Sequence, residues 1–355
     1  MWKAVRYDDS YFDSIIDMSV ENFGEENDIC NKDFLKHQYF DNPVGSALIE
    51  LAVDPNNGTL AGQYVVAPAK FRCFGKNILV VTSLNTLTRK AYRGQKIFVG
   101  LAEKTYARAT QDGFAFCYGA PNQNSHHGFI AKLGFKDICE FPLYIRPLDT
   151  SKMVEQRMHN KLLTIAAKPF NLFFYGKGQN TKGIAELTED NIYLMDEFWN
   201  KVKDYYQIIG VRDAKYIHYR YMNVPRRIYY PYVAIEMGQV VAFAVGRIRE
   251  MAHFNCGMIV DFLYVKGFEK QAGALIELLV KRMKDEGASL AGCIMLSHTK
   301  EAKELTKCGF FKCPDKLLPQ PTPLILRVFE NKLNGDDKVN DIKNWFFTTG
   351  DYDVV

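Results

Sequence analysis

One short turn combines backbone freedom and positive charge at the junction of a strand and a helix. The stretch SLNTLTRKAYRGQKIFVGLAE begins as a β-branched strand and is expected to become a helix at Gln95. The first N–H groups of a helix lack intrahelical acceptors and attract anions. Gly94 lets a ligand approach the backbone, and Arg93 and Lys96 add positive charge. The turn predicts a site for a phosphate-bearing ligand, although Arg-Gly in such a loop is often only a turn.

A second group of polar side chains follows the next predicted strand. The strand at 114–118 leads into a helix at 125–133, with His126 and His127 in its first turn. Histidine titrates near neutral pH and a tyrosine hydroxyl can donate a proton, so His126 and Tyr118 are candidates for acid–base chemistry. The alternative is that the histidines are polar residues at a helix start. Cys117 could be acylated, but a cysteine in a buried strand favours a core position.

The C-terminal residues form a third candidate. The sequence ends in NWFFTTGDYDVV, where an apolar Trp-Phe-Phe strand precedes Gly350 and two aspartates. Termini are usually poorly ordered unless they dock. We therefore expect the tail to dock on the body of the protein and to place Asp351 in a substrate cleft, where it would bind or deprotonate an amine. An added edge strand with solvated acids is the alternative.

Three pairs of similar segments divide the chain into two halves. FLKHQYFDNP resembles YIHYRYMNVP, NGTLAGQYVV resembles MGQVVAFAVG, and KLGF resembles KCGF, in the same order along the chain. Ordered internal similarity of this kind indicates a duplication. The predicted parts are an N-terminal domain at 1–147, a basic helical linker at 148–185, a C-terminal domain at 186–335 and a tail at 336–355.

Each half shows antiparallel strands first and then strands linked through helices. This order predicts an α/β class with mixed α+β sheets: two tandem domains, each with a mixed, mostly antiparallel central sheet flanked by helices. The expected strands are 47–53, 60–68, 76–87, 114–118, 232–236, 240–248, 257–265, 291–296 and 323–329. The expected helices are 8–25, 31–40, 95–112, 125–133, 151–167, 270–286 and 300–307.

Composition excludes several classes of protein. The 355 residues are 47% hydrophobic and carry a net charge of +4, which suits a globular protein and is too small to predict a nucleic-acid partner. The sequence shows no secretory signal, no apolar span of about 18 residues, and no CxxC pair among eight cysteines. We expect a cytoplasmic protein with reduced thiols and no metal. The basic segment 151–175 is either a packed crossing helix or a weak peripheral membrane contact.

The order of elements and the turn at 93–98 resemble the GNAT superfamily of acetyltransferases. The acetyl-CoA motif of that family reads Gln/Arg-x-x-Gly-x-Gly/Ala; its turn holds the pyrophosphate and the preceding strand pairs with the pantetheine arm. A strand, FAFCYGAPN, that opens into a helix ending in LGF is similar to the second element of the family. The resemblance covers the first half in motif and the second half in architecture only. It implies an acetyl-CoA or other acyl-CoA donor bound by Leu87, Thr88, Arg93, Gly94, Gln95, Lys96, Ile97, Phe98, Asn122, Asn124 and Ser125.

Some residues depart from the pattern of the family. Lys96 and Phe98 stand where the family has small residues, and Ile130 stands where many members have a tyrosine acid, so Tyr118 or a water is expected to act instead. In the second half the corresponding segment lacks Arg-Gly, and the charge of Glu269 would repel phosphate. We expect the second half to keep the fold without the CoA site; a second site with another ligand is the alternative.

These features predict an acyl-CoA-dependent N-acyltransferase, with acetyl-CoA as the first expectation, acting on a primary amine of a small molecule, an amino sugar or a peptide. Such a reaction needs a route for the amine proton and a donor to the developing oxyanion, for which a strand N–H near Leu87 is expected. The strands at 76–87 and 114–118 would splay to hold the thioester. Two alternatives stay open: a Fem-like aminoacyltransferase of cell-wall synthesis, and a catalytically inactive GNAT-like binding protein.

Overall fold

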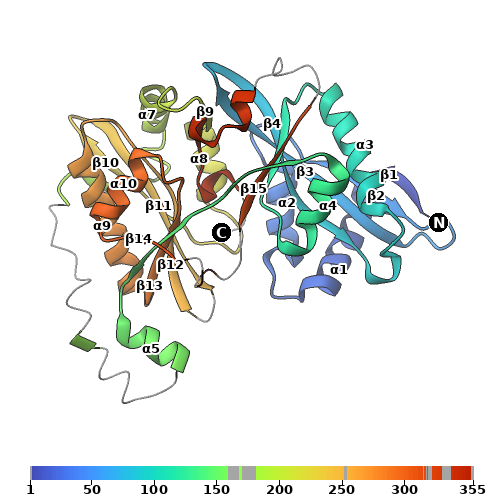
Figure 1. The fold of residues 1–355 in the computed structure, drawn as a ribbon, viewed down its shortest axis with the longest axis horizontal. Coiled ribbons are helices and arrows are strands. Elements are labelled where there is room, and N and C mark those ends of the chain that lie inside the picture. The colour runs from blue at the N-terminus through green and yellow to red at the C-terminus, as the bar shows by residue number, and fades with distance from the viewer. Residues whose placement is uncertain are drawn as a thin grey trace. The chain divides into compact units, whose positions relative to one another are not determined.

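The structure, a computed structural model, describes residues 2–158, 168–169, 181–251, 254–314, 316, 318, 322–329 and 337–352. The chain separates into two compact units (Figure 1). Unit 1 contains Met1–Glu140, Val224–Arg226 and Thr322–Asn344; unit 2 contains Phe141–Asn223, Arg227–Pro321 and Trp345–Val355. Among the described residues, no helix has both the length and the apolar character that crossing a bilayer would require.

The sheet of unit 1 has the order β1-β2-β3-β4-β5-β15-β6. Its strands are β1 (Lys3–Arg6), β2 (Leu48–Val53), β3 (Leu60–Cys73), β4 (Lys76–Thr88), β5 (Phe116–Gly119), β15 (Pro323–Val328) and β6 (Lys136–Glu140). Neighbouring strands are antiparallel except β4 and β5, which are parallel and joined by α3 (Ile97–Gln111). A parallel pair needs such a crossover helix, and this β–α–β unit creates the candidate site.

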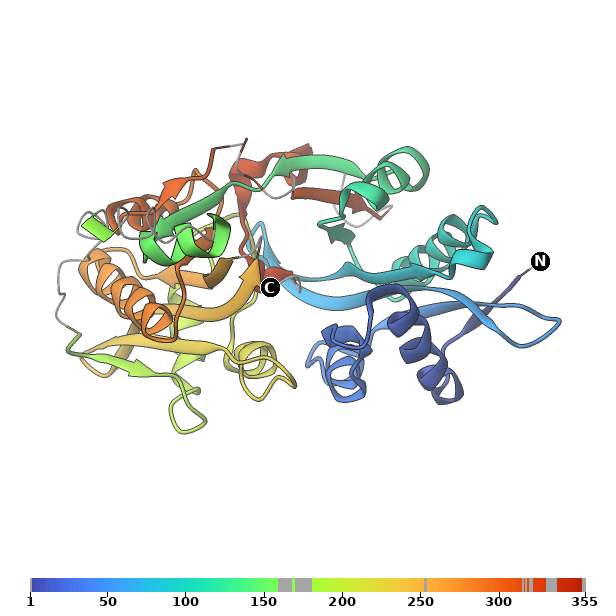
Figure 2. The same ribbon diagram turned by 90° about the horizontal axis from the view of Figure 1, so that it is seen from below.

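Helices cover both faces of this sheet. Figure 2 shows α1 (Phe12–Phe23) and α2 (Lys32–Phe40) in dark blue below the strands, and α3 in teal above them. One core, on the α3 and α4 (Gln123–Leu133) side, includes Leu101, Tyr106 and Val81; the other, on the α1 and α2 side, includes Ile15 and Leu51. Because β3 and β4 are buried on both faces, their central residues are almost all apolar or hydrogen-bonded.

Unit 2 contains a sheet with the order β14-β7-β13-β12-β11-β10-β8. Its strands are β14 (Phe311–Lys312), β7 (Leu143–Pro147), β13 (Leu290–Ile294), β12 (Phe254–Tyr264), β11 (Gln239–Met251), β10 (Tyr230–Glu236) and β8 (Ile184–Glu186). The remaining elements are α5 (Thr150–Met158), α7 (Leu194–Val202), β9 (Ile208–Gly210), α8 (Ala214–Tyr221), α9 (Glu269–Asp285), α10 (Lys300–Lys307) and β16 (Trp345–Phe346). β12 and β13 are parallel and joined by α9, so unit 2 repeats the β–α–β arrangement of unit 1.

The predicted fold class is confirmed, and the predicted elements lie within a few residues of the observed ones. Two strands pair in a way that the sequence does not reveal. β7 follows β6 in the chain but pairs with β13 and β14 in unit 2, and β15 lies between β5 and β6 in unit 1. Alternating hydrophobicity selects a strand but does not name the edge with which it pairs. Of the predicted linker helix, α5 is described, and most of the segment 151–175 lies outside the described residues.

Candidate functional site

The parallel strands β4 and β5 separate soon after they meet. They pair only at Val81 with Cys117 and at Thr82 with Tyr118. β5 ends at Gly119, whereas β4 continues to Thr88 along β3. The segment 83–88 of β4 therefore has an edge beyond its pairing with β5, which is the splayed arrangement expected from the sequence.

A bulge in β4 lies at this point of separation. Gln63 pairs with Leu87 and Val65 with Leu84, so two residues of β4, Asn85 and Thr86, oppose one residue of β3. Asn85 has a φ of +47°, which is uncommon for a residue with a side chain. Such a bulge turns backbone groups out of the ladder, and bulges are frequent next to active sites.

The bulge is fixed by hydrogen bonds of amide side chains. The Asn85 amide donates to Gln38 Oε1 at 2.5 Å and to the hydroxyl of Tyr39 at 3.2 Å, and Gln63 Nε2 donates to Asn85 O at 2.7 Å. α2 supplies Gln38 and Tyr39, so this helix holds the backbone of the bulge in place. The residues are spread over three elements, and no spacing in the sequence indicates that they form one network.

Three buried polar atoms near the bulge lack a hydrogen-bond partner among the described residues. They are Gln63 Oε1, Thr82 Oγ1 and Thr86 Oγ1. Buried polar atoms in folded proteins are nearly always hydrogen-bonded, to the protein, to water or to a ligand. Their concentration on β3 and β4 where β5 departs favours a polar ligand at this place.

The turn before α3 has the geometry of an anion site. Gly94 has a φ of +82° and Lys96 a φ of +59°, so both use the left-handed region. α3 begins at Ile97 with no side-chain cap and no acidic residue in its first turn. The residues Arg93 to Lys96 are exposed, and a Cβ placed on Gly94 would meet no atom within 4 Å. The helix start can therefore receive an anion without obstruction from the protein.

Phe98, one departure from the family motif, points into the core. Its ring lies 5.3 Å from that of Phe129 and 5.8 Å from that of Tyr64. A Cβ added to Gly128 of α4 would lie 3.1 Å from the Phe98 ring. The large residue on α3 thus faces a glycine on α4, and the ring leaves the exposed side of the turn free.

A chain of hydroxyl groups lies on the α3 side of the separating strands. The Tyr64 and Tyr106 hydroxyls hydrogen-bond to each other, and Ser83 Oγ donates to the Tyr64 hydroxyl at 3.3 Å. Burial raises the pKa of Tyr64 and of Tyr106, so both hydroxyls stay protonated. The sequence analysis did not single out these residues, because they come from three separate elements.

The other residues predicted in unit 1 lie on β5 and α4. Tyr118 is buried among Phe71 and Phe116, with ring centroids at 5.4 and 6.3 Å. Asn122 caps α4 by accepting from the N–H groups of Asn124 and Ser125, both at 3.1 Å. These three polar residues therefore form a helix cap, the alternative role that the residue types allow.

His126 forms an ion pair with an acid that the sequence analysis did not name. Its Nε2 lies 2.6 Å from Asp137 Oδ1 of β6, and the two side chains are 33% and 51% exposed. A carboxylate in this position fixes the orientation of an imidazole ring. The pair is accessible to solvent, as a group that exchanges protons must be.

Asp351 does not lie in an open cleft, and this corrects the sequence expectation for that residue. It is 4% exposed, and its carboxylate accepts from Arg212 at 3.0 and 2.7 Å and from the Thr348 N–H at 3.0 Å. Burial raises its pKa, and the Arg212 guanidinium opposes that shift. The tail does dock, but it docks Asp351 as a buried ion-pair partner within unit 2.

Cys117 behaves as a core residue. It is fully buried, and burial raises the pKa of its thiol well above the usual range. A thiol in this state is a weak nucleophile because the thiolate is scarce. Within the described residues, no three His, Cys, Asp or Glu side chains are grouped so that they could hold a metal ion.

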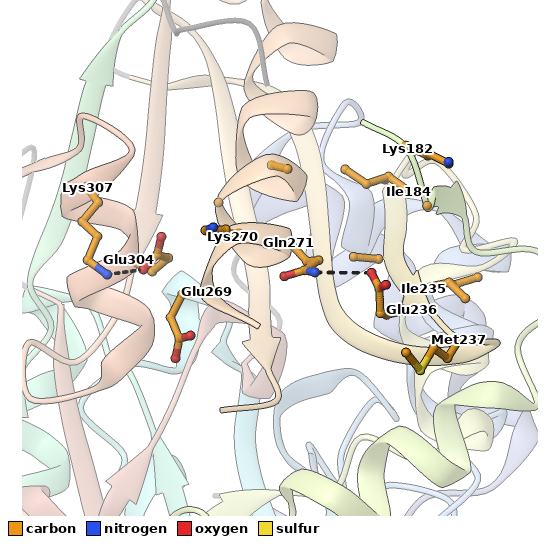
Figure 3. A pocket seen from close by; sticks show the side chains of 14 residues that line it. Lys182, Ile184, Ile235, Glu236, Met237, Glu269, Lys270, Gln271, Glu304 and Lys307 are labelled. Carbon is orange, nitrogen blue, oxygen red and sulfur yellow. Dashed lines mark hydrogen bonds and ion pairs between the residues drawn. The ribbon is translucent and has the colours of Figure 1, made fainter. Parts of the chain in front are cut away.

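Unit 2 differs from unit 1 at the start of its crossover helix. Glu269 opens α9, and its carboxylate accepts from the Gly267 N–H at 3.1 Å. A pocket of about 840 Å³ borders this helix start, lined by Glu236, Glu269 and Glu304 among others (Figure 3). Lys307 lies 2.7 Å from Glu304, and Gln271 donates to Glu236 at 3.3 Å. Lys182, Lys270 and Lys307 also line the pocket and balance the three carboxylates, so the pocket lacks the net positive charge that favours a diphosphate.

Comparison with solved structures identifies this arrangement. The chain superposes on N-myristoyltransferase from Saccharomyces cerevisiae, solved with bound myristoyl-CoA, with a TM-score of 0.65 and 12% identity over 92% of this chain and 82% of that one. A GCN5-related N-acetyltransferase from Anabaena variabilis gives 0.59 and 10% identity, covering 92% and 73%. The fold is that of the GNAT superfamily. The resemblance predicted from the sequence is thus confirmed at the level of fold.

A third solved structure, a protein from Enterococcus faecalis described as a probable N-acyltransferase, gives a TM-score of 0.61 and 12% identity, covering 93% of this chain and 73% of that one. No family model and no curated protein sequence matches the chain. At this level of identity the likeness describes the backbone, and the chemistry has to be argued from the residues of this chain.

Proposed function

We propose that the protein is an acyl-CoA-dependent N-acyltransferase whose donor site lies in unit 1. The observation that carries the proposal is the combination of an uncapped, positively charged α3 start with parted strands that leave polar atoms without partners. Each feature alone is common. Together, on a GNAT fold, they suit a ligand with a phosphate end and an extended polar arm.

The residues present fit such a donor. The N–H groups at the start of α3, with Arg93 and Lys96, would hold the diphosphate, because Gly94 leaves the approach open. The free edge of β4 after Thr82 would pair with the amides of the pantetheine arm, as an added strand does. Thr86, whose buried hydroxyl lacks a partner, would donate to or accept from that arm.

The chemistry requires little from side chains. Bound acyl-CoA supplies an activated thioester carbonyl to an amine. The bulge at Asn85 and Thr86 would direct backbone N–H groups at the oxyanion that develops on that carbonyl. Gln38, Tyr39 and Gln63 hold the bulge, so these donors are preorganised.

Two protons must move in the reaction. We propose His126, oriented by Asp137, as the group that takes the proton from the acceptor amine, because it is accessible and paired with a carboxylate. As the proton donor to the leaving thiolate, we favour the hydroxyl chain of Ser83, Tyr64 and Tyr106 over Tyr118. This chain connects protonated hydroxyls and begins at Ser83, next to the point where β4 and β5 part.

The proposal is tested by measuring the free thiol of CoA that acyl transfer releases. Purified protein is incubated with acyl-CoA donors from acetyl to myristoyl and with a panel of amines that includes polyamines, amino sugars and peptides with free N-termini. Amine-dependent thiol release with at least one pair supports the proposal, and the preferred donor length and amine class define the substrates. Absence of release with every pair, while CoA binds, would instead support the GNAT-like binding protein.

A further inference from the structure

The sheet of unit 2 has an opening equivalent to the one between β4 and β5. β12 and β13 pair over 256–259 and 290–293, and β12 then continues to Tyr264 while β13 ends at Ile294. Along this continuation, β12 pairs with β11 at its other edge. The β13 side of residues 260–264 therefore corresponds to the donor edge of β4.

The C-terminal segment Thr348 to Tyr352, which follows β16 and its pairing with β9, lies in this opening. Thr349 Oγ1 donates to Val260 O at 3.0 Å, and Thr348 Oγ1 donates to Asp261 Oδ1 at 3.0 Å, so the segment contacts β12. Thr348 also forms an antiparallel bridge with Met295, directly after β13. The tail thus touches both strands that border the opening.

Two buried arginines hold the tail in place. Arg212, which is fully buried, pairs with Asp261 at 3.0 Å and with Asp351 at 2.7 Å. Arg220 donates to the carbonyls of Thr349 at 3.2 Å and Gly350 at 3.3 Å. Thr349 to Asp351 form a short 3-10 turn, so these contacts recognise the carbonyls of a turn and one carboxylate, which a peptide ligand can offer.

The anion position at the start of α9 is also filled by the chain itself. The Glu269 carboxylate accepts the Gly267 N–H and the N–H of its own residue, and these backbone bonds lower its pKa. At the start of α3 no acidic side chain takes that place. Both parts of a donor site, the helix start and the strand edge, are therefore occupied internally in unit 2.

We infer that unit 2 keeps the groove of the GNAT fold as a binding site for a polypeptide turn, and that residues 348–352 are its resident ligand. The groove selects a threonine followed three residues later by an aspartate, through Asp261 and Arg212. Acyl-CoA does not bind there; this last part rests on the proposed function of unit 1. The carboxylate at 351 acts as an anchor for the tail.

Hydrogen exchange followed by mass spectrometry tests the inference on the full-length protein. Asp351→Asn removes the anchor, and the milder Thr349→Val removes the bond to Val260. Asp341→Asn is the matched control, since Asp341 is exposed and its carboxylate accepts only from the nearby Lys343 N–H among the bonds described. We expect exchange about tenfold faster or more in 260–264, 295–299 and 345–352 of Asp351→Asn, a smaller increase in Thr349→Val, and none in the control.

Two outcomes would overturn the inference: unchanged exchange in those segments, or acceleration spread evenly through unit 2. If Asp351→Asn does not fold, the exchange of Thr349→Val in those segments decides whether the inference holds. Calorimetry with CoA adds a second criterion on the wild-type chain. One CoA per chain is expected, and two per chain would contradict a filled groove. No CoA binding would refute the proposed function, and the exchange map would still decide whether the tail occupies the groove.

Discussion

Replacing Gly94 by alanine separates two proposed roles of this residue, which are to adopt the left-handed backbone of the turn and to leave room for the diphosphate. Its φ of +82° lies where a residue with a Cβ is strained, at a cost of about 1–2 kcal/mol. For a unit of this size, that cost lowers Tm by about 2–8 °C. The new Cβ meets no protein atom within 4 Å, so it points into the space that the diphosphate would enter.

The magnitude for binding follows from the contacts at the helix start. Holding a phosphate oxygen away from one N–H costs about 1.5–3 kcal/mol, because the hydrogen bond is charge-assisted. Gly94→Ala should therefore weaken CoA binding about ten- to a hundredfold. The matched control is Gly75→Ala in the β3–β4 hairpin, where φ is +77° and the added Cβ also meets nothing within 4 Å.

Calorimetry with CoA and thermal unfolding are measured on both variants. The two should lose similar stability, and only Gly94→Ala should lose affinity. Equal CoA affinity in the two variants would refute the placement of the diphosphate at this turn, whatever their stabilities.

Four further predictions follow. His126→Asn should lower kcat at least about tenfold with little change in KM, and an unchanged kcat would exclude His126 as the base. Asp351→Asn should lower Tm, because breaking a buried ion pair costs about 3–5 kcal/mol, and should leave the pH profile of activity unchanged. A lost limb of that profile with a wild-type Tm would instead show that Asp351 takes part in catalysis. Cys117→Ala should keep activity, and native alkylation should spare Cys117, since burial raises the pKa of its thiol; loss of turnover at wild-type Tm would contradict this. Backbone hydrogen bonds lower the pKa of Glu269, so its ionised form stabilises the fold above the ordinary pKa of 4.5. This contribution to stability is lost as the pH falls from 4.5 through the lowered pKa. A Glu269 titration midpoint above 4.5 by NMR would contradict the stabilising role of these bonds.

The sequence predicted the parts that depend on local pattern. Gly94, Arg93 and the β-branched strand before them give a local signal, and the turn, the helix and the strand lie where they were expected. The docking of an apolar tail was likewise visible, because Trp345 and Phe346 would not stay in water. These features depend on the period and on the conformational preferences of neighbouring residues.

The remainder depends on contacts between distant residues. The sequence pattern predicts Asp351 in a substrate cleft, and its actual partner, Arg212, could not be found from the sequence because it lies 139 positions away in the chain. The bulge at Asn85 is held by Gln38 from α2, and no spacing in the sequence connects the two. The pairing of β7 and β15 in different sheets was also invisible, because a strand pattern does not specify its neighbour.

The central claim is that the turn before α3 binds the diphosphate of an acyl-CoA donor. CoA binding by calorimetry to wild-type protein, Arg93→Glu and Lys76→Glu tests it most directly. Lys76 is exposed at the opposite end of β4, so its reversal gives the same change in net charge beyond screened electrostatic range. We predict that wild type binds CoA, that Arg93→Glu binds at least about tenfold more weakly, and that Lys76→Glu binds like wild type. No binding to wild type at millimolar CoA, or equal affinity for all three proteins, would contradict the claim.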